Sequence, residues 1–250
     1  MDAETNKRIM ILSKFAPHLV RSLVNGHKEG HGGATGDLLS LFILIEERLL
    51  NVNNGQHKII ELGSGIGQFG LCAWAWRHRE QIICVECDKH RHEYNHRWVE
   101  AIKNNGRTRR MSNLPIPILD DFTNPSSQLL ISAFQSVAPR MYLNNAGAVL
   151  NGEVQNKLSS VLDGFCDTGA ILVTLDTFFH HQPLWAEVCY EVLLPRSQLS
   201  WLARNSQGST KKVLIFKYTK CSEPQYRGKR RPRITGAGSP LSCLDFFPEV

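Results

Sequence analysis

The chain has 250 residues, of which 42% are hydrophobic and 21% charged, and 29 basic against 23 acidic side chains give a formal net charge of +6. This length allows one large domain or two small ones, and 19 glycines with 11 prolines exclude a collagen-like or low-complexity chain. The most apolar run, residues 38–45, is far shorter than the roughly 20 residues that cross a bilayer. The first residues lack the basic start and apolar stretch of a secretory signal, and seven irregularly spaced cysteines favour reduced thiols. We therefore expect a globular, intracellular protein without membrane contact.

The first 57 residues have mostly helical patterns, and Asp37 is placed to cap an apolar, buried helix over residues 38–50. From residue 58 onward, short β-rich runs alternate with helical ones. We expect strands over residues 58–62, 81–86, 116–119, 140–143, 170–174, 198–202 and 212–218. We expect helices over residues 68–77, 89–104, 127–136, 153–162 and 184–194. Prolines in the third strand place it toward an edge of the sheet.

This alternation predicts an α/β fold with a doubly wound, parallel sheet, closed by a hairpin of the last two strands. Three regions follow from it. Residues 1–57 form a helical N-terminal segment, residues 58–220 form the core, and residues 221–250 form a basic tail. Proline, glycine, arginine and serine dominate that tail, so we expect it to be mobile.

The strongest local motif is the glycine-rich turn after the first expected strand. Residues 61–67 read Glu-Leu-Gly-Ser-Gly-Ile-Gly, and Gln68 follows. Glycines at such a turn let a ligand approach the backbone closely. Glu86 ends the second expected strand, 25 residues after Glu61, where an acid can accept hydrogen bonds from both hydroxyls of a ribose. Together these residues predict a nucleoside site.

Three interpretations of this turn are open. It could be a strand–helix connection without a ligand, or a dinucleotide site, although Gln68 occupies the position of the last glycine in Gly-x-Gly-x-x-Gly. A run of Asn-Asn-Ala-Gly at residues 144–147 is typical of short-chain dehydrogenases, but Tyr190 is not followed by their lysine, since Leu194 stands there. The third interpretation is an S-adenosylmethionine site, in which Glu61 can pair with the ammonium group of the cofactor.

Several motifs in series resemble one methyltransferase family, the non-SET histone H3 lysine methyltransferases known as the disruptor-of-telomeric-silencing family. That family reads Asp-Leu-Gly-Ser-Gly-Val-Gly-Gln at the turn, and residues 61–68 read Glu-Leu-Gly-Ser-Gly-Ile-Gly-Gln. Its Gly-Val-Glu, Gly-Asp-Phe and Val-Asn-Asn-Phe are similar to Cys-Val-Glu at residues 84–86, Asp-Asp-Phe at 120–122 and Leu-Asn-Asn-Ala at 143–146. Its later Glu-Val and Ser-Trp pairs match residues 153–154 and 200–201. The resemblance runs from about residue 31 to 218 and is to the compact, protozoan-type members.

The chain also departs from that family. The family's cofactor loop begins Tyr-Gly-Glu-Thr, whereas residues 31–38 read His-Gly-Gly-Ala-Thr-Gly-Asp-Leu. The tyrosines that help to line the family's lysine channel correspond to Ile215 and Phe216, and the aromatic residue after Asn-Asn is Ala146.

The resemblance implies a class I, Rossmann-like methyltransferase fold with a mostly parallel seven-stranded sheet and helices on both faces. It implies S-adenosyl-L-methionine as cofactor, no metal, and transfer of a methyl group to a lysine in the globular part of histone H3. The implied cofactor-binding residues are Gly33, Ala34, Thr35, Glu61, Gly63, Ser64, Gly65, Gly67, Gln68, Glu86, Asp121, Phe122 and Asn144.

Asn144 is the implied catalytic residue, because its side-chain oxygen could orient the attacking amine at the carboxyl end of the fourth strand. Free lysine has a pKa of about 10.4, so forming the neutral amine at pH ~7.4 costs roughly 4 kcal/mol unless an apolar channel lowers that pKa. Methyl transfer from a sulfonium is an in-line displacement, for which the protein supplies position and a neutral nucleophile.

The excess positive charge lies in the tail, which suits a substrate wrapped in DNA. We expect a nuclear, monomeric protein that contacts nucleosomal DNA without reading its sequence. The expected contacts are Arg227, Lys229, Arg230, Arg231 and Arg233. A second, smaller basic cluster comprises Arg107, Arg109 and Arg110.

Two alternatives remain at this point. One is a class I methyltransferase that modifies RNA or a non-histone protein, and the other is a catalytically silent chromatin-binding module with the same fold. Cysteines 84 and 87 with nearby histidines could suggest zinc, but no second cysteine pair follows at the spacing of a zinc ribbon.

Overall fold

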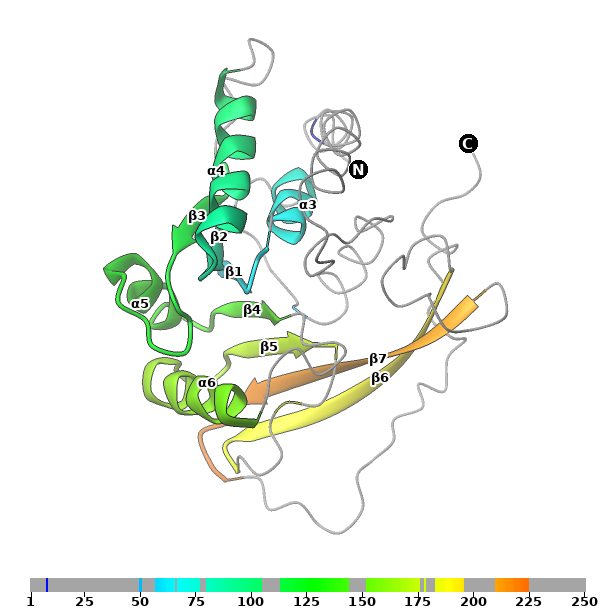
Figure 1. The fold of residues 1–250 in the computed structure, drawn as a ribbon. Helices are drawn as coiled ribbons and strands as arrows, with labels where there is room; N and C mark the ends of the chain where they lie inside the picture. Colours follow the sequence, from blue (N-terminus) through cyan, green and yellow to red (C-terminus); the bar gives the residue numbers. More distant parts are fainter. Residues whose placement is uncertain are drawn as a thin grey trace.

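A computed structural model describes residues 8, 50, 57–65, 67–76, 80–104, 113–143, 152–175, 178, 183–195 and 210–224 of the chain. These residues form a seven-stranded sheet with helices on both faces (Figure 1). The strands are β1 (Lys58–Leu62), β2 (Gln81–Glu86), β3 (Ile116–Leu119), β4 (Arg140–Leu143), β5 (Ile171–Thr174), β6 (Trp185–Pro195) and β7 (Thr210–Lys220). The helices are α3 (Gln68–Trp76), α4 (Lys89–Asn104), α5 (Gln128–Phe134) and α6 (Gly152–Phe165).

The strands lie in the order β3-β2-β1-β4-β5-β7-β6. Strands β1 to β5 are parallel to one another, while β7 is antiparallel to both β5 and β6. The chain reverses its winding at β1 and β4, which is the switch point where open α/β sheets bind ligands. The predicted doubly wound sheet is confirmed, and the proline-containing β3 lies at its edge as expected.

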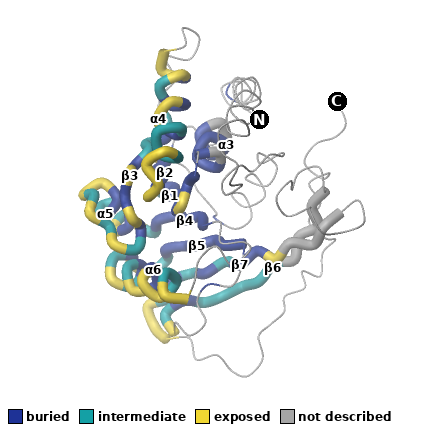
Figure 2. The backbone as a smooth tube through the Cα atoms, in the orientation of Figure 1, coloured by how far each residue is buried: buried dark blue, intermediate teal, exposed yellow. Residues whose placement is uncertain are grey.

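Alternate residues of the central strands face two different helical layers. Ile60 and Leu62 of β1 join a core with residues of α5 and α6, including Leu130 and Leu158. The intervening Glu61 faces α3, where its carboxylate accepts the N–H of Gly70. Because strand side chains alternate with a period of two, both faces of these strands must be covered, and both faces are buried (Figure 2).

The long strand β6 corrects one prediction. We expected a helix over residues 184–194, but residues 185–195 pair antiparallel with β7 from Trp185↔Lys220 to Pro195↔Thr210. Alanine, glutamate and leucine gave this segment a helical pattern, whereas Val188 and Tyr190 favour a strand. The pairing with β7 decides the outcome, because it joins residues that are distant in sequence. The expected strand over residues 198–202 lies outside the described residues.

Three described residues belong to the N-terminal segment, Arg8, Leu50 and His57, and the first two are buried. Leu50 is fully buried. The guanidinium of Arg8 lies over the ring of Trp74 on α3, with Cζ 4.9 Å from the centroid, and its Nη1 donates to the Trp74 carbonyl (3.3 Å). The predicted helix over residues 38–50 otherwise lies outside the described part of the chain, as do all of the residues from 225 to 250.

Lys220 joins the last strand to the end of α6. Its buried ammonium group donates to the carbonyls of Leu162, Asp163 (2.8 Å) and Cys166 at the C-terminus of that helix. The Leu162 carbonyl also accepts the Cys166 N–H (3.0 Å). A cation at the C-terminus of a helix interacts favourably with the helix dipole.

We expect Lys220→Met to lower the free energy of unfolding by about 3 kcal/mol, because it leaves buried carbonyls without a charged donor. Urea denaturation measures this loss. Lys157→Met is the matched control, since Lys157 is exposed and pairs with Glu153 at the surface (2.8 Å), where such pairs contribute less than about 1 kcal/mol. Similar losses in the two variants would show that the contacts of Lys220 are not stabilising.

Among the described helices, none has both the length and the apolar character needed to cross a membrane.

Candidate functional site

The glycine-rich turn connects β1 to α3 at the carboxyl edge of the sheet. Gly63, Gly65 and Gly67 all have positive φ angles of 67°, 55° and 79°. The Ser64 N–H donates to the carbonyl of Val85 on β2 (2.8 Å), and the Gly67 N–H donates to the carbonyl of Ser64 (2.8 Å). These bonds hold the turn against the end of β2, as the motif predicts.

Glycine occupies positions 63, 67 and 70 for different physical reasons. Among the described residues, the atom nearest to a Cβ at Gly63 would be Cε1 of Phe122, at 3.6 Å, and Gly63 is exposed. A Cβ at Gly67 would collide with the side-chain amide of Asn95, and one at Gly70 would collide with Sγ of Cys84. Gly63 therefore leaves room for a ligand, whereas Gly67 and Gly70 are required by packing inside the protein.

Glu86 places a buried carboxylate directly beside this turn. Its Oε2 accepts the Gly65 N–H (2.6 Å), and its Oε1 accepts the N–H of Asp88 (2.9 Å). The Cys87 thiol also donates weakly to Oε1 (3.8 Å), whereas Oε2 keeps a second lone pair for a hydroxyl donor. The sequence analysis expected Glu86 and the glycine turn to lie together by analogy with nucleoside sites. The structure brings the two into direct contact.

The segment after β3 lies next to the same turn. Asp120 is buried and accepts bonds from the backbone N–H groups of Ser126 (3.0 Å) and Ser127 (2.8 Å), which fixes the loop before α5. These hydrogen bonds lower the pKa of Asp120 against the opposing effect of desolvation. Asp121 is exposed, and its Oδ1 accepts the N–H and hydroxyl of Thr123 (2.8 and 2.7 Å). Phe122 is buried, and its Cε1 lies 3.6 Å from the position of a Cβ built on Gly63, so the ring borders the turn.

Glu61 lies beneath the turn, on the α3 face of the sheet. The residue is 6% exposed, and its Oε2 accepts the Gly70 N–H at 2.9 Å. Desolvation raises its pKa to about 8, and the nearby charge of Glu86 acts in the same direction. The same burial raises the pKa of the neighbouring Cys84 thiol. Glu61 is therefore mostly protonated at neutral pH in the ligand-free protein.

Asn95 and Cys84 are two residues of this region that sequence reasoning did not assign. Asn95 is fully buried on α4, and its Nδ2 donates to the hydroxyl of Ser64 (3.3 Å). A polar residue on the apolar stripe formed by Trp98, Val99 and Ile102 was the available signal. Its contact with the turn could not be read from the sequence, because α4 packs there only in the folded protein.

Several predicted site residues lie outside the described residues, so their roles stay predictions. These are the loop residues Gly33, Ala34 and Thr35, the catalytic candidate Asn144, and the side chain of Gln68. The described part of the chain contains no group of three or more histidine, cysteine, aspartate or glutamate side chains that could hold a metal ion.

The strand order, with an antiparallel β7 between β5 and β6, defines the class I methyltransferase fold of S-adenosylmethionine-dependent enzymes, and the chain has this fold. No protein-family model and no curated protein matches the sequence.

Similar solved structures are methyltransferases of distant sequence. Precorrin-6y C5,15-methyltransferase from Geobacter metallireducens has 9% identity and a TM-score of 0.48, over 78% of this chain and 93% of that one. The glycopeptide N-methyltransferase MtfA complexed with sinefungin has 10% identity and a TM-score of 0.48, over 82% and 97%. An RNA methyltransferase from Salinibacter ruber in complex with S-adenosyl-L-homocysteine has 15% identity and a TM-score of 0.44, over 77% and 97%.

Proposed function

We propose that the protein is an S-adenosylmethionine-dependent methyltransferase whose substrate is a lysine in the globular part of histone H3 in nucleosomes. The observation that carries the methyltransferase activity is the turn itself, where the buried Glu86 carboxylate lies 2.6 Å from the Gly65 N–H and Gly63 leaves open space. The substrate rests on the ordered series of motifs similar to the non-SET histone H3 lysine methyltransferases.

The residues around the turn fit this cofactor. Glu86 would accept hydrogen bonds from the ribose hydroxyls, Asp121 would accept the adenine amino group, and Phe122 would pack beside the ring. Glu61 would pair with the ammonium group of the methionine moiety. The bound cofactor supplies an electrophilic methyl group on a sulfonium. Gly33, Ala34, Thr35, Ser64, Gly67 and Gln68 complete the proposed binding set.

Asn144 is the proposed catalytic residue. It directly follows Leu143, the last residue of β4, and so comes at the carboxyl edge of the sheet beside β1. Its amide oxygen would orient the substrate amine without adding charge, and apolar surroundings would favour the neutral amine over the ammonium form. The proton of the lysine must leave before the amine can attack, because only the neutral amine has a free lone pair.

The proposed partner is the nucleosome and the proposed location is the nucleus. The five cations of the tail, from Arg227 to Arg233, can each neutralise a phosphate and release counterions. Such contacts would position a monomeric enzyme on any nucleosome without reading DNA sequence.

The cofactor site is tested by Glu86→Ala. We expect this change to weaken S-adenosylmethionine binding at least tenfold, because it removes the proposed acceptor of both ribose hydroxyls; this corresponds to about 1.4 kcal/mol. Isothermal titration calorimetry measures the affinity. Glu100→Ala is the matched control, since Glu100 lies on α4 and pairs with Lys103 (2.7 Å). Equal affinities for the parent protein and Glu86→Ala would contradict the assignment.

The substrate is tested with labelled S-adenosylmethionine and recombinant nucleosomes, free histones, total RNA and non-histone proteins. We expect label in histone H3 of nucleosomes, and Asn144→Ala should lose most of it. Label in RNA or in a non-histone protein would contradict the histone assignment while leaving the methyltransferase intact. Failure to bind the cofactor at millimolar concentration would instead indicate a silent chromatin-binding module.

A further inference from the structure

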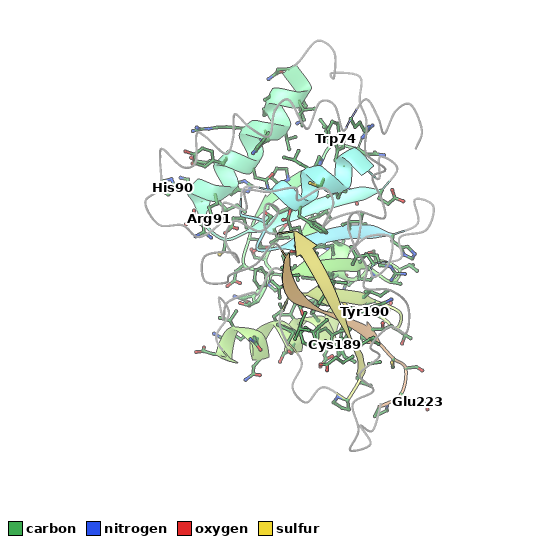
Figure 3. The ribbon with its side chains drawn as sticks, turned by 90° about the vertical axis from the view of Figure 1, so that its right-hand side faces the viewer. Trp74, His90, Arg91, Cys189, Tyr190 and Glu223 are labelled. Carbon is green, nitrogen blue, oxygen red and sulfur yellow. The ribbon has the colours of Figure 1, made fainter. Side chains whose placement is uncertain are left out.

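The first half of α4 carries a group of basic and histidine side chains on the surface of the protein. Lys89, His90, His96 and Arg97 are exposed, and Arg91 is half-buried in the first turn of the helix. Figure 3 shows His90 and Arg91 at the start of this helix, on the outside of the molecule. We call these five residues the α4 basic face.

The permanent charges of the α4 basic face are available to a partner. Within the described residues, none of its lysine and arginine side chains forms an ion pair, whereas Lys103 farther along the helix pairs with Glu100 (2.7 Å). Arg97 is exposed, and its guanidinium lies over the ring of Tyr94, with Cζ 5.5 Å from the centroid.

Two acidic residues on this stretch, Asp88 and Glu93, offset only part of the charge of Lys89, Arg91 and Arg97. Asp88 caps the helix, because its Oδ1 accepts the Arg91 N–H (2.9 Å), and this bond is the main cause of its lowered pKa. Glu93 is the one other acid between residues 88 and 97. The positive end of the helix dipole adds to the cationic character of the first turn.

The α4 basic face begins close to the proposed active site. α4 begins at Lys89, three residues after Glu86, so the basic face starts at the edge of the sheet that holds the glycine turn. In sequence, the helix is followed by the basic cluster of Arg107, Arg109 and Arg110, which extends the run of positive charge beyond Asn104.

We propose that the α4 basic face binds the phosphate backbone of duplex DNA. Lys89 and Arg97 are eight residues apart, and about 12 Å of helix separates them, a length over which duplex DNA carries about seven phosphate charges. Lysine and arginine supply charge, and the two exposed histidines add hydrogen-bond donors even when they are neutral. The inference deepens the proposed function, and it rests on that function for the proposal that the DNA is nucleosomal. On a nucleosome, this contact would hold DNA beside the cofactor turn.

The test compares salt dependence in full-length variants. Lys89→Gln/Arg97→Gln removes two cations of the α4 basic face, and Lys103→Gln/Lys157→Gln removes two exposed lysines that already pair with glutamates. Binding to a fluorescent 30-base-pair duplex is measured by anisotropy between 50 and 200 mM salt. We expect the slope of log affinity against log salt to become shallower by about 1.8 in the first variant and to stay unchanged in the control. Over this range, the parent protein should lose about 12-fold more affinity than the Lys89→Gln/Arg97→Gln variant.

Equal slopes in the parent and the Lys89→Gln/Arg97→Gln variant would overturn the proposal, as would an equal change in the control. A slope change with single-stranded RNA but not with duplex DNA would also overturn it. Circular dichroism checks the fold of each variant, and the two single variants replace the double variant if its melting temperature falls. Because DNA binding is measured without methyl transfer, its result is independent of whether histone H3 is the substrate.

Discussion

The free energy of unfolding of the parent protein should fall as the pH rises from about 4.5 to about 8, and Glu61→Gln should abolish this fall. Burial raises the pKa of this carboxyl group to about 8 in the folded protein, from 4.5 in its ordinary state. Between these values the folded protein holds a proton that the unfolded chain has released, so raising the pH favours unfolding. The contribution is complete below about pH 4.5 and is lost as the pH passes 8.

The expected size of this effect is on the order of 5 kcal/mol across the window. Glutamine resembles the protonated acid, and its side-chain oxygen can still accept the Gly70 N–H. Urea unfolding at pH 5, 6.5 and 8 measures the difference between the parent and Glu61→Gln. Glu100→Gln is the control, because Glu100 is exposed. Parallel stability curves for the parent and Glu61→Gln would show that Glu61 titrates at its ordinary pKa in the folded protein.

The same group links the proposed cofactor to pH. Pairing with the ammonium group of S-adenosylmethionine requires the ionised carboxylate, and that form becomes populated only as the pH approaches 8. Cofactor binding should therefore tighten between pH 6.5 and 8 in the parent and lose this dependence in Glu61→Gln. An unchanged pH dependence in the variant would assign the ammonium contact to another residue.

Gly67→Ala should lower the free energy of unfolding by about 3 kcal/mol. Two costs add at this position. Alanine is strained at a φ of 79°, and its Cβ would collide with the amide of Asn95, which is fully buried and cannot move into solvent. Urea or thermal denaturation measures the loss.

Gly63→Ala separates the two costs. Its φ of 67° is similarly unfavourable, but the nearest atom of the described residues to the new Cβ is 3.6 Å away, so only the strain of about 1 kcal/mol should remain. Asn95→Ala in the Gly67→Ala background should recover part of the loss in a double-mutant cycle, because it removes the collision. Equal losses at Gly63 and Gly67, with no coupling to Asn95, would exclude the packing explanation.

The two ends of α4 show what local sequence can determine. The predicted helix over residues 89–104 matches α4, because Asp88 provides a cap and an Asn-Asn-Gly run follows. The core strands and the glycine turn were also predictable, since apolar runs and glycines at a strand end act within a few residues. The pairing of Glu86 with the turn followed from both strands being parallel neighbours.

Only the tertiary structure decided those features that depend on contacts between residues distant in the chain. The segment over residues 184–194 had a helical composition and became a strand because β7, about 20 residues later, supplies its hydrogen bonds. The need for glycine at position 67 comes from Asn95 on another element, and the raised pKa of Glu61 comes from the layers that exclude water around it. The sequence alone thus determined the local elements and the chemistry of the turn, because neighbouring residues specify them. Which glycine faces a ligand and which carboxyl group keeps its proton were decided by packing, because only the folded chain sets the space and the solvation of each group.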